Sequence, residues 1–145
     1  MATETKSAAV LASLPIGKAV TVRKTVGETD VYLFAGISGD FAPIHVDEEF
    51  MKQTRYGRRI AHGALMIAYM SQASTRICEG IGGTVVSYGY DRIRFPKPVF
   101  IGDTITVTYE IAERDVAAGK TFSKVTCTNQ RGEVVAVATH IMKFV

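Results

Sequence analysis

The chain has 145 residues, of which 47% are hydrophobic and 21% are charged, and these values are typical of one globular domain. Its 17 basic and 14 acidic residues give a formal net charge of +3 at pH 7, which is too small and too scattered to predict binding to nucleic acid. No apolar stretch approaches the roughly 20 residues that a membrane-spanning helix needs, so a membrane partner is not expected either.

The start of the chain and the two cysteines indicate a cytoplasmic protein. We expect residues 1–15 to form a loose segment before a single domain at 16–145. The weakly apolar part of that segment, residues 8–14, lacks the pattern of a secretory signal. Cys78 and Cys127 have neither a C-x-x-C nor a metal-ligand spacing, and we expect both to be reduced and buried.

One short strand and two helices are predicted in the first part of the domain. Residues 19–23 have the composition of a strand. Thr29 is the expected N-cap of the next helix, which has Asp30 in its first turn and ends at Gly39. The apolar stripe of that helix is expected to consist of Val31, Phe34 and Ile37. Asp47 is the expected cap of a second, shorter helix.

The most informative helix is predicted to begin near His62 and Gly63. Residues 64–70 contain no charged side chain, and polarity returns only from Ser71 onward. A helix that is apolar on every side for two turns is typically buried. Glycines from Gly80 onward end it, so the sequence predicts one central helix inside the domain.

The remaining sequence changes to a period of two. Strands are expected at residues 84–95, 104–111, 124–128 and 134–141, with His140 on the face of the last one. Runs of strands after a helix favour antiparallel pairing. The predicted fold class is therefore α+β, with an antiparallel sheet wrapped around the long central helix.

Asp40 and His45 form the clearest candidate site. A carboxylate and an imidazole are the usual pair for moving protons near neutral pH. Gly39 and Pro43 prevent a regular helix between them, and Pro43 also favours an extended conformation at Ala42. The same spacing also occurs in ordinary turns, but the flanking residues favour a functional site.

Three sequence blocks resemble one known family. They are SGDFAPIH at 38–45, IAHG at 60–63 and FPKPVFIGD at 95–103. In this order and spacing they resemble the MaoC-like (R)-specific enoyl-CoA hydratases, which have the hotdog fold. The resemblance implies a lyase that adds water reversibly to trans-2-enoyl thioesters, carried by coenzyme A or an acyl-carrier protein, and yields (R)-3-hydroxyacyl thioesters. It also implies a homodimer or a higher assembly of dimers, a place in fatty acid metabolism, no cofactor and no metal.

The resemblance also implies a role for each matching position. Asp40 and His45 would activate the water, the backbone N–H of Gly63 would polarise the thioester carbonyl, and Ser71 would shape the site. The positions expected to contact the substrate are Ala42, Pro43 and His62. The start of a helix favours developing negative charge, and a glycine there permits close approach, so the role of Gly63 is physically reasonable. The alternative interpretation is that Gly63 and His62 serve only to begin the helix and that the Ser71 hydroxyl bonds to its own helix.

One departure from the family motif leaves alternatives open. The motif usually reads Asp-x-Asn-Pro-x-His, and this chain has Ala42 in place of the Asn. This departure favours the alternative of a non-catalytic acyl-thioester-binding protein, and a thioesterase of the same fold is a separate alternative. The basic residues that could meet the phosphates of a carrier are Arg55, Arg58, Arg59, Arg92, Arg94 and Lys97.

Overall fold

The structure is a computed structural model that describes residues 2–145, with the side chains of residues 7–145. Within this range five strands form one antiparallel sheet, in the order β1-β3-β4-β5-β2. The strands are β1 (Ala19–Thr25), β2 (Val85–Arg94), β3 (Thr104–Asp115), β4 (Lys120–Thr128) and β5 (Val134–Phe144). The helices are α1 (Ala2–Ser13), α2 (Glu28–Ser38), α3 (Pro43–Val46), α4 (Glu48–Lys52) and α5 (Gly63–Ile77). The predicted α+β class with an antiparallel sheet is confirmed.

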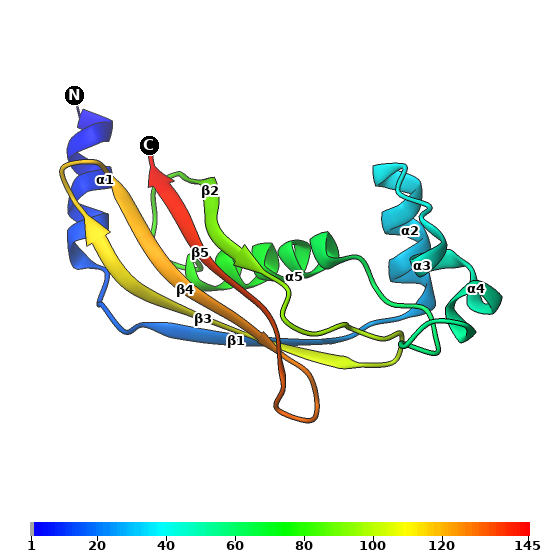
Figure 1. Cartoon of the computed structure of the whole chain (residues 1–145). Helices are drawn as coiled ribbons and strands as arrows, with labels where there is room; N and C mark the ends of the chain where they lie inside the picture. Colours follow the sequence, from blue (N-terminus) through cyan, green and yellow to red (C-terminus); the bar gives the residue numbers. More distant parts are fainter. Residues whose placement is uncertain (1) are drawn as a thin grey trace.

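The longest helix, α5, lies along the sheet, where it contacts β1, β3 and β4 (Figure 1). Helices α2, α3 and α4 gather at one end of the molecule, and α1 lies at the other end beside the last strand (Figure 1). The chain therefore passes from β1 through three helices before it enters α5. This passage carries the 38–47 segment, in which the candidate acid–base residues lie.

The period of two in β3 determines which side chains form the core. Ile105, Val107, Tyr109 and Ile111 are all buried, as their alternation with threonine and glutamate predicted. The register of β3 with β4 then places Val107 opposite Cys127 and Tyr109 opposite Val125, which are also buried. These side chains form the layer on which α5 packs.

Helix α5 is buried on one side rather than on every side. Its core-facing residues are Leu65, Met66, Tyr69, Met70, Ala73 and Ile77. On the other side Ala64 and Ala68 are exposed, although both are apolar. The expectation of burial all round was therefore wrong, because a single sheet layer covers only one face of the helix.

A helix occupies residues 2–13, where a loose segment was expected at residues 1–15. Residues 2–13 form α1, and Leu11 and Leu14 are buried in the main core. The guanidinium of Arg114 donates to the carbonyls of Ala12 and Leu14, and the hydroxyl of Ser7 donates to the carbonyl of Val145 at 2.9 Å. Contacts with distant parts of the chain thus hold this segment in place.

The N-cap of α2 lies two residues earlier in the sequence than the predicted cap, Thr29. Its N-cap is Gly27, and the Asp30 carboxylate accepts a hydrogen bond from the Gly27 N–H at 2.7 Å. Gly39 ends the helix in the left-handed conformation, as predicted, with φ of 79°. Among the expected apolar stripe, Val31 is buried, but Ile37 is 85% exposed because it lies on the side of α2 away from the core.

Two smaller predictions can be compared with the structure. The carboxylate of Asp47 accepts from the N–H of Phe50 at 2.9 Å and caps α4, as expected. Cys127 is buried and Cys78 half-buried, and both are free thiols. Burial raises the pKa of the Cys127 thiol to about 12 and also raises that of Cys78, so both stay protonated at neutral pH. No helix in residues 2–145 is long and apolar enough to cross a membrane.

Candidate active site

The turn between α2 and α3 brings Asp40 and His45 together. Gly39 ends α2 and Pro43 is the first residue of α3, so the chain reverses direction between the two helices. Asp40 lies in the turn with a side chain that is 52% exposed, and its Oδ1 accepts from the N–H of Ala42 at 3.2 Å. His45 lies in α3 and is buried. The site therefore has one solvent-facing acid and one sheltered imidazole.

The imidazole of His45 is oriented by a backbone carbonyl. Its Nδ1 lies 2.7 Å from the carbonyl oxygen of Ile60. A carbonyl can only accept, so Nδ1 carries the hydrogen and Nε2 of the neutral ring is a free acceptor. Nε2 lies 3.8 Å from Oδ2 of Asp40, which is longer than a hydrogen bond. Two acceptors at this separation can share the hydrogens of one water molecule.

His62, just before α5, contacts both members of the pair. Its Nε2 donates to the backbone carbonyl of Asp40 at 2.9 Å. Its ring stacks on the ring of His45, with centroids 3.7 Å apart and planes at 25°. His62 is 2% exposed, and its Nδ1 has no hydrogen-bond partner among the described residues. The sequence predicted a substrate contact or a helix start here, and gave no signal for these two contacts.

A cavity of about 540 Å³ opens beside these histidines. His45, His62 and Gly63 line its inner part, and Phe95 lines it from the segment that follows β2. Gly63 is the first residue of α5, so its N–H has no acceptor within the helix. A Cβ on Gly63 would lie only 2.9 Å from the ring of Phe95, so the close packing of this ring requires glycine.

The other predicted site residues lie at different distances from this cavity. Ala42 is the N-cap of α3 and Pro43 its first residue, so both adjoin Asp40. Ser71 is two turns along α5 on its exposed side, where it borders a separate hollow beside Ser87 of β2. The structure therefore brings Asp40, His45 and His62 together with Gly63 nearby, and leaves Ser71 outside this group.

The same three polar residues are also of the types that bind metal ions. Ligand atoms of Asp40, His45 and His62 lie within 4.8 Å of one another. Each histidine has one ring nitrogen at a backbone carbonyl, which leaves the other nitrogen available either to a metal ion or for proton transfer.

Two of the predicted basic residues border the cavity, namely Arg55 and Lys97. Arg59 instead bonds to Glu28 at 2.5 Å and to Glu48 at 2.6 Å, which holds α2 and α4 together. These bonds to Glu48 and Glu28 raise the pKa of the Arg59 guanidinium further above its usual value. Arg55, whose guanidinium donates to the hydroxyl of Tyr56, therefore supplies positive charge at the cavity, whereas Lys97 is paired with Glu133, and Arg59 with Glu28 and Glu48.

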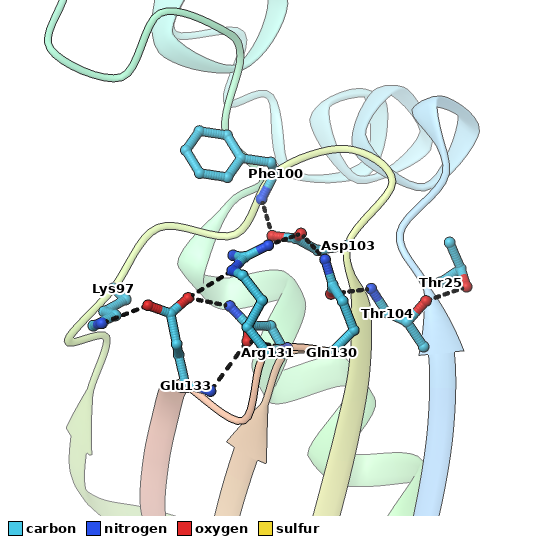
Figure 2. Close-up of polar contacts among 9 residues, drawn as sticks. Thr25, Lys97, Phe100, Asp103, Thr104, Gln130, Arg131 and Glu133 are labelled. Atoms are coloured by element: carbon cyan, nitrogen blue, oxygen red, sulfur yellow. Dashed lines mark hydrogen bonds and ion pairs between the residues drawn. The ribbon is translucent and has the colours of Figure 1, made fainter.

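A polar network joins the segment between β2 and β3 to the β4–β5 turn (Figure 2). The carboxylate of Asp103, 3% exposed, accepts from the N–H of Phe100 at 2.9 Å and from side chains of Gln130 and Arg131. Burial alone would raise the pKa of Asp103, but these hydrogen bonds hold it below its usual value.

Glu133 extends this network to the cavity-lining segment (Figure 2). Its carboxylate accepts from Lys97 at 2.6 Å and from Arg131 at 2.9 Å. Hydrogen bonds from Lys97, Asn129 and Arg131 lower the pKa of Glu133 to about 2. The β4–β5 turn therefore holds the segment that carries Phe95 in place.

Comparison with known proteins identifies relatives with the same arrangement of elements. The (R)-specific enoyl-CoA hydratase of Rhodospirillum rubrum is 38% identical over 95 residues, which cover 66% of this chain and 64% of that protein. The 3-hydroxybutyryl-CoA dehydratase of Methylorubrum extorquens is 32% identical over 124 residues, or 86% of this chain and 76% of the relative. Among solved structures, the (R)-hydratase from A. caviae involved in PHA biosynthesis has a TM-score of 0.82 at 26% identity, and the match covers 92% of this chain and 98% of that chain.

These structural neighbours establish the hotdog fold, as the resemblance implied. The match to the MaoC like domain extends over residues 12–134 and so includes the 38–47 turn, α5 and most of the sheet. The chain therefore belongs to the MaoC-like domain family.

Proposed function

We propose that the protein adds water reversibly to trans-2-enoyl thioesters and forms (R)-3-hydroxyacyl thioesters. One observation carries the proposal: the Asp40 carboxylate lies 3.8 Å from the free Nε2 of His45, and His45 lines a cavity of about 540 Å³. The relatives from R. rubrum and M. extorquens are named as a hydratase and a dehydratase, and these names support the same reaction class.

In the proposed reaction, Asp40 and His45 hold one water molecule between them. One proton of the water passes to this pair while its hydroxyl oxygen bonds to C3 of the enoyl group. The pair then returns a proton to C2, so that the net change is addition of water across the double bond. Positioned general acid–base groups of this kind contribute roughly 10²–10⁴-fold to a rate. The reaction needs no covalent intermediate.

The backbone N–H of Gly63 is proposed to stabilise the enolate oxygen of the thioester. It stands at the positive end of α5 and borders the cavity beside His45 and His62. One such donor is worth roughly 3–4 kcal/mol in comparable oxyanion holes. Ala42 and Pro43 are proposed to shape the turn that presents Asp40 to the substrate, because they begin α3 directly after it.

A homodimer is proposed to form through the free edge of β2. The two edges of the sheet are β1 and β2. The exposed side chains of β1 include Arg23 and Lys24, which oppose edge pairing, whereas the first half of β2 exposes Val86 and Tyr88 and carries its exposed charged residues only from residue 91 onward. Ser71 borders the hollow beside β2, the strand at the proposed dimer interface. The proposed role of Ser71 in shaping a site therefore depends on formation of this dimer.

The thioester carrier is proposed to be coenzyme A or an acyl-carrier arm, with Arg55 and Lys97 as the charges nearest to the cavity. The cytoplasm is the proposed compartment, on the composition and the cysteines. A panel of enoyl-CoA substrates of increasing length would define the acyl chain that the cavity accepts. Light scattering at micromolar concentration would test the dimer, and a monomer under these conditions would contradict it.

The reaction can be tested with crotonyl-CoA. We expect loss of the enoyl absorbance without release of free thiol, and chiral analysis should identify the product as (R)-3-hydroxybutyryl-CoA. Free thiol without a hydroxyacyl product would indicate a thioesterase instead. Binding of acyl-CoA without turnover, even at high protein concentration, would indicate a non-catalytic binding protein, the alternative that Ala42 leaves open.

A further inference from the structure

We propose that His62 is a positioning residue that holds Asp40 and His45 in the relative orientation that hydration requires. This inference rests on the function proposed above. Its ring nitrogen fixes the backbone of the acid, and its ring face fixes the imidazole. Within residues 2–145, the other hydrogen bonds of Asp40 involve only Ser38 and Ala42, its own neighbours in the turn. His62 therefore provides the hydrogen bond that ties Asp40 to the interior of the protein.

The position of Asp40 depends on this bond because the residue is otherwise weakly held. Its two local hydrogen bonds are both 3.2 Å long, and its side chain is 52% exposed. The bond from His62 Nε2 to the Asp40 carbonyl is shorter, at 2.9 Å, and its donor is buried. Since Asp40 lies beside a glycine in the left-handed conformation, this anchor restricts a turn that could otherwise shift.

The ring of His62 cannot move away easily, because it lies between two other rings. His45 stacks on it with a centroid separation of 3.7 Å, and Phe34 of α2 packs against it at 4.8 Å. His45 is in turn held at its Nδ1 by the carbonyl of Ile60. The imidazole plane of His45 is thus fixed at one edge and on one face, and Nε2 is left pointing toward Asp40.

Hydrogen bonding also determines the tautomer of His62. The Asp40 carbonyl only accepts, so Nε2 carries the hydrogen and Nδ1 of the neutral ring is a lone pair. This buried Nδ1 has no partner among the described residues. A neutral His62 presents an uncharged ring to His45, and it avoids two positive rings in contact when His45 takes the proton from water.

Two substitutions separate the two contacts. His62→Gln keeps an amide donor close to the position of Nε2 but removes the stacked ring. His62→Phe keeps a ring against His45 but removes the donor to Asp40. Because misplacement of reacting groups by about 1 Å can cost on the order of 10²-fold, we expect each variant to lower kcat by roughly 10- to 100-fold, with KM changed by no more than about twofold.

The matched control is His140→Phe, which removes a buried histidine that does not border this cavity. It should lower the melting temperature without lowering kcat per folded molecule. The pH–rate profile provides a further readout. Loss of the contacts that hold Asp40 and His45 should shift the acidic or the basic limb of this profile in the two His62 variants and not in the control. Wild-type kcat and an unchanged pH profile in both folded His62 variants would overturn the proposal.

Nitrogen NMR of the imidazole rings keeps this test independent of the proposed reaction. In the wild-type protein we expect His45 with hydrogen on Nδ1 and His62 with hydrogen on Nε2, and both His62 variants should shift the His45 signals. The opposite tautomer of His62 in the wild type would contradict the proposal even if the variants failed to fold. Inactivity of the wild type on every enoyl-CoA would contradict the proposed function, and the NMR results would still decide the role of His62.

Discussion

His45 and His140 are both buried histidines, but their ring nitrogens are used differently. His140 in β5 is 0% exposed, with Nε2 2.8 Å from the hydroxyl of Ser87 and Nδ1 2.8 Å from the hydroxyl of Tyr109. In His45, Nδ1 donates to the carbonyl of Ile60, and Nε2 faces Asp40 without a hydrogen bond to it. A histidine with both nitrogens satisfied links parts of the structure, whereas one with a free nitrogen beside a cavity can exchange protons.

The largest expected effect is on turnover, when the free nitrogen of His45 is removed. In His45→Asn the side-chain amide takes the place of Nδ1 and can still donate to the carbonyl of Ile60, but nothing replaces Nε2. We expect the protein to fold and turnover of crotonyl-CoA to fall by at least about 10²-fold. Asp40→Asn, which conserves volume and removes the carboxylate, should cost a similar factor. Near-wild-type rates in either folded variant would refute its proposed role.

The second prediction concerns stability at low pH and the fully bonded His140. Burial lowers the pKa of His140 from 6.5 to about 4, so the ring is neutral in the folded protein at neutral pH. As pH falls below about 6.5, the unfolded chain binds a proton that the folded chain does not bind until about pH 4. The free energy of unfolding should therefore decrease across this window, by about 3 kcal/mol for this group. Urea unfolding at a series of pH values measures the decrease.

His140→Phe is the matched control for this pH dependence. The phenyl ring can stack on Tyr90, as the imidazole does at 4.1 Å, but it cannot titrate. Burial raises the pKa of both Tyr90 and Tyr109, so these neighbours stay neutral throughout the window. The variant should be less stable at pH 7, by about 1–3 kcal/mol for the buried hydroxyl of Tyr109, because the exposed Ser87 can bond to water instead, and it should lose less stability toward pH 4. Equal pH slopes in variant and wild type would show that His140 is not the group responsible.

Local patterns explain how much of the fold could be predicted from the sequence. The alternation in β3 and the uncharged stretch at the start of α5 depend on neighbouring residues only. The start of each element was predicted correctly, although β3 extends four residues beyond its predicted end at residue 111. Helix α1 was missed because its burial depends on Arg114 and Val145, far away in the sequence. The exposed side of α5 was missed because a single sequence does not reveal how many layers pack on a helix.

The candidate site, like the fold, could be predicted only where it depends on neighbouring residues. Gly39 and Pro43 make the turn, so the approach of Asp40 to His45 followed from residues within it. The contact of His62 with Asp40 did not, because it joins residues 22 positions apart through a backbone carbonyl. A backbone acceptor has no side-chain signature, and only the folded structure reveals it.

The smallest expected effect comes from restoring the family residue at position 42. Ala42 is the N-cap of α3 and makes no side-chain cap hydrogen bond. Asn is among the best N-cap residues, and its side chain could accept from a backbone N–H of α3, the helix that carries His45. Ala42→Asn should therefore raise the free energy of unfolding by about 0.5–2 kcal/mol and change turnover by no more than roughly a few-fold.

Ala42→Leu tests the reason for that effect, because it adds volume without a hydrogen-bond acceptor. Urea unfolding should show a gain for Ala42→Asn and none for Ala42→Leu, and turnover with crotonyl-CoA and longer enoyl-CoAs should rise only in the former. A gain in both variants would attribute the effect to packing instead of capping. No change in stability, rate or substrate range for Ala42→Asn would mean that Pro43 and the bond from His62 already fix the turn, and that the departure at position 42 has no cost for the site.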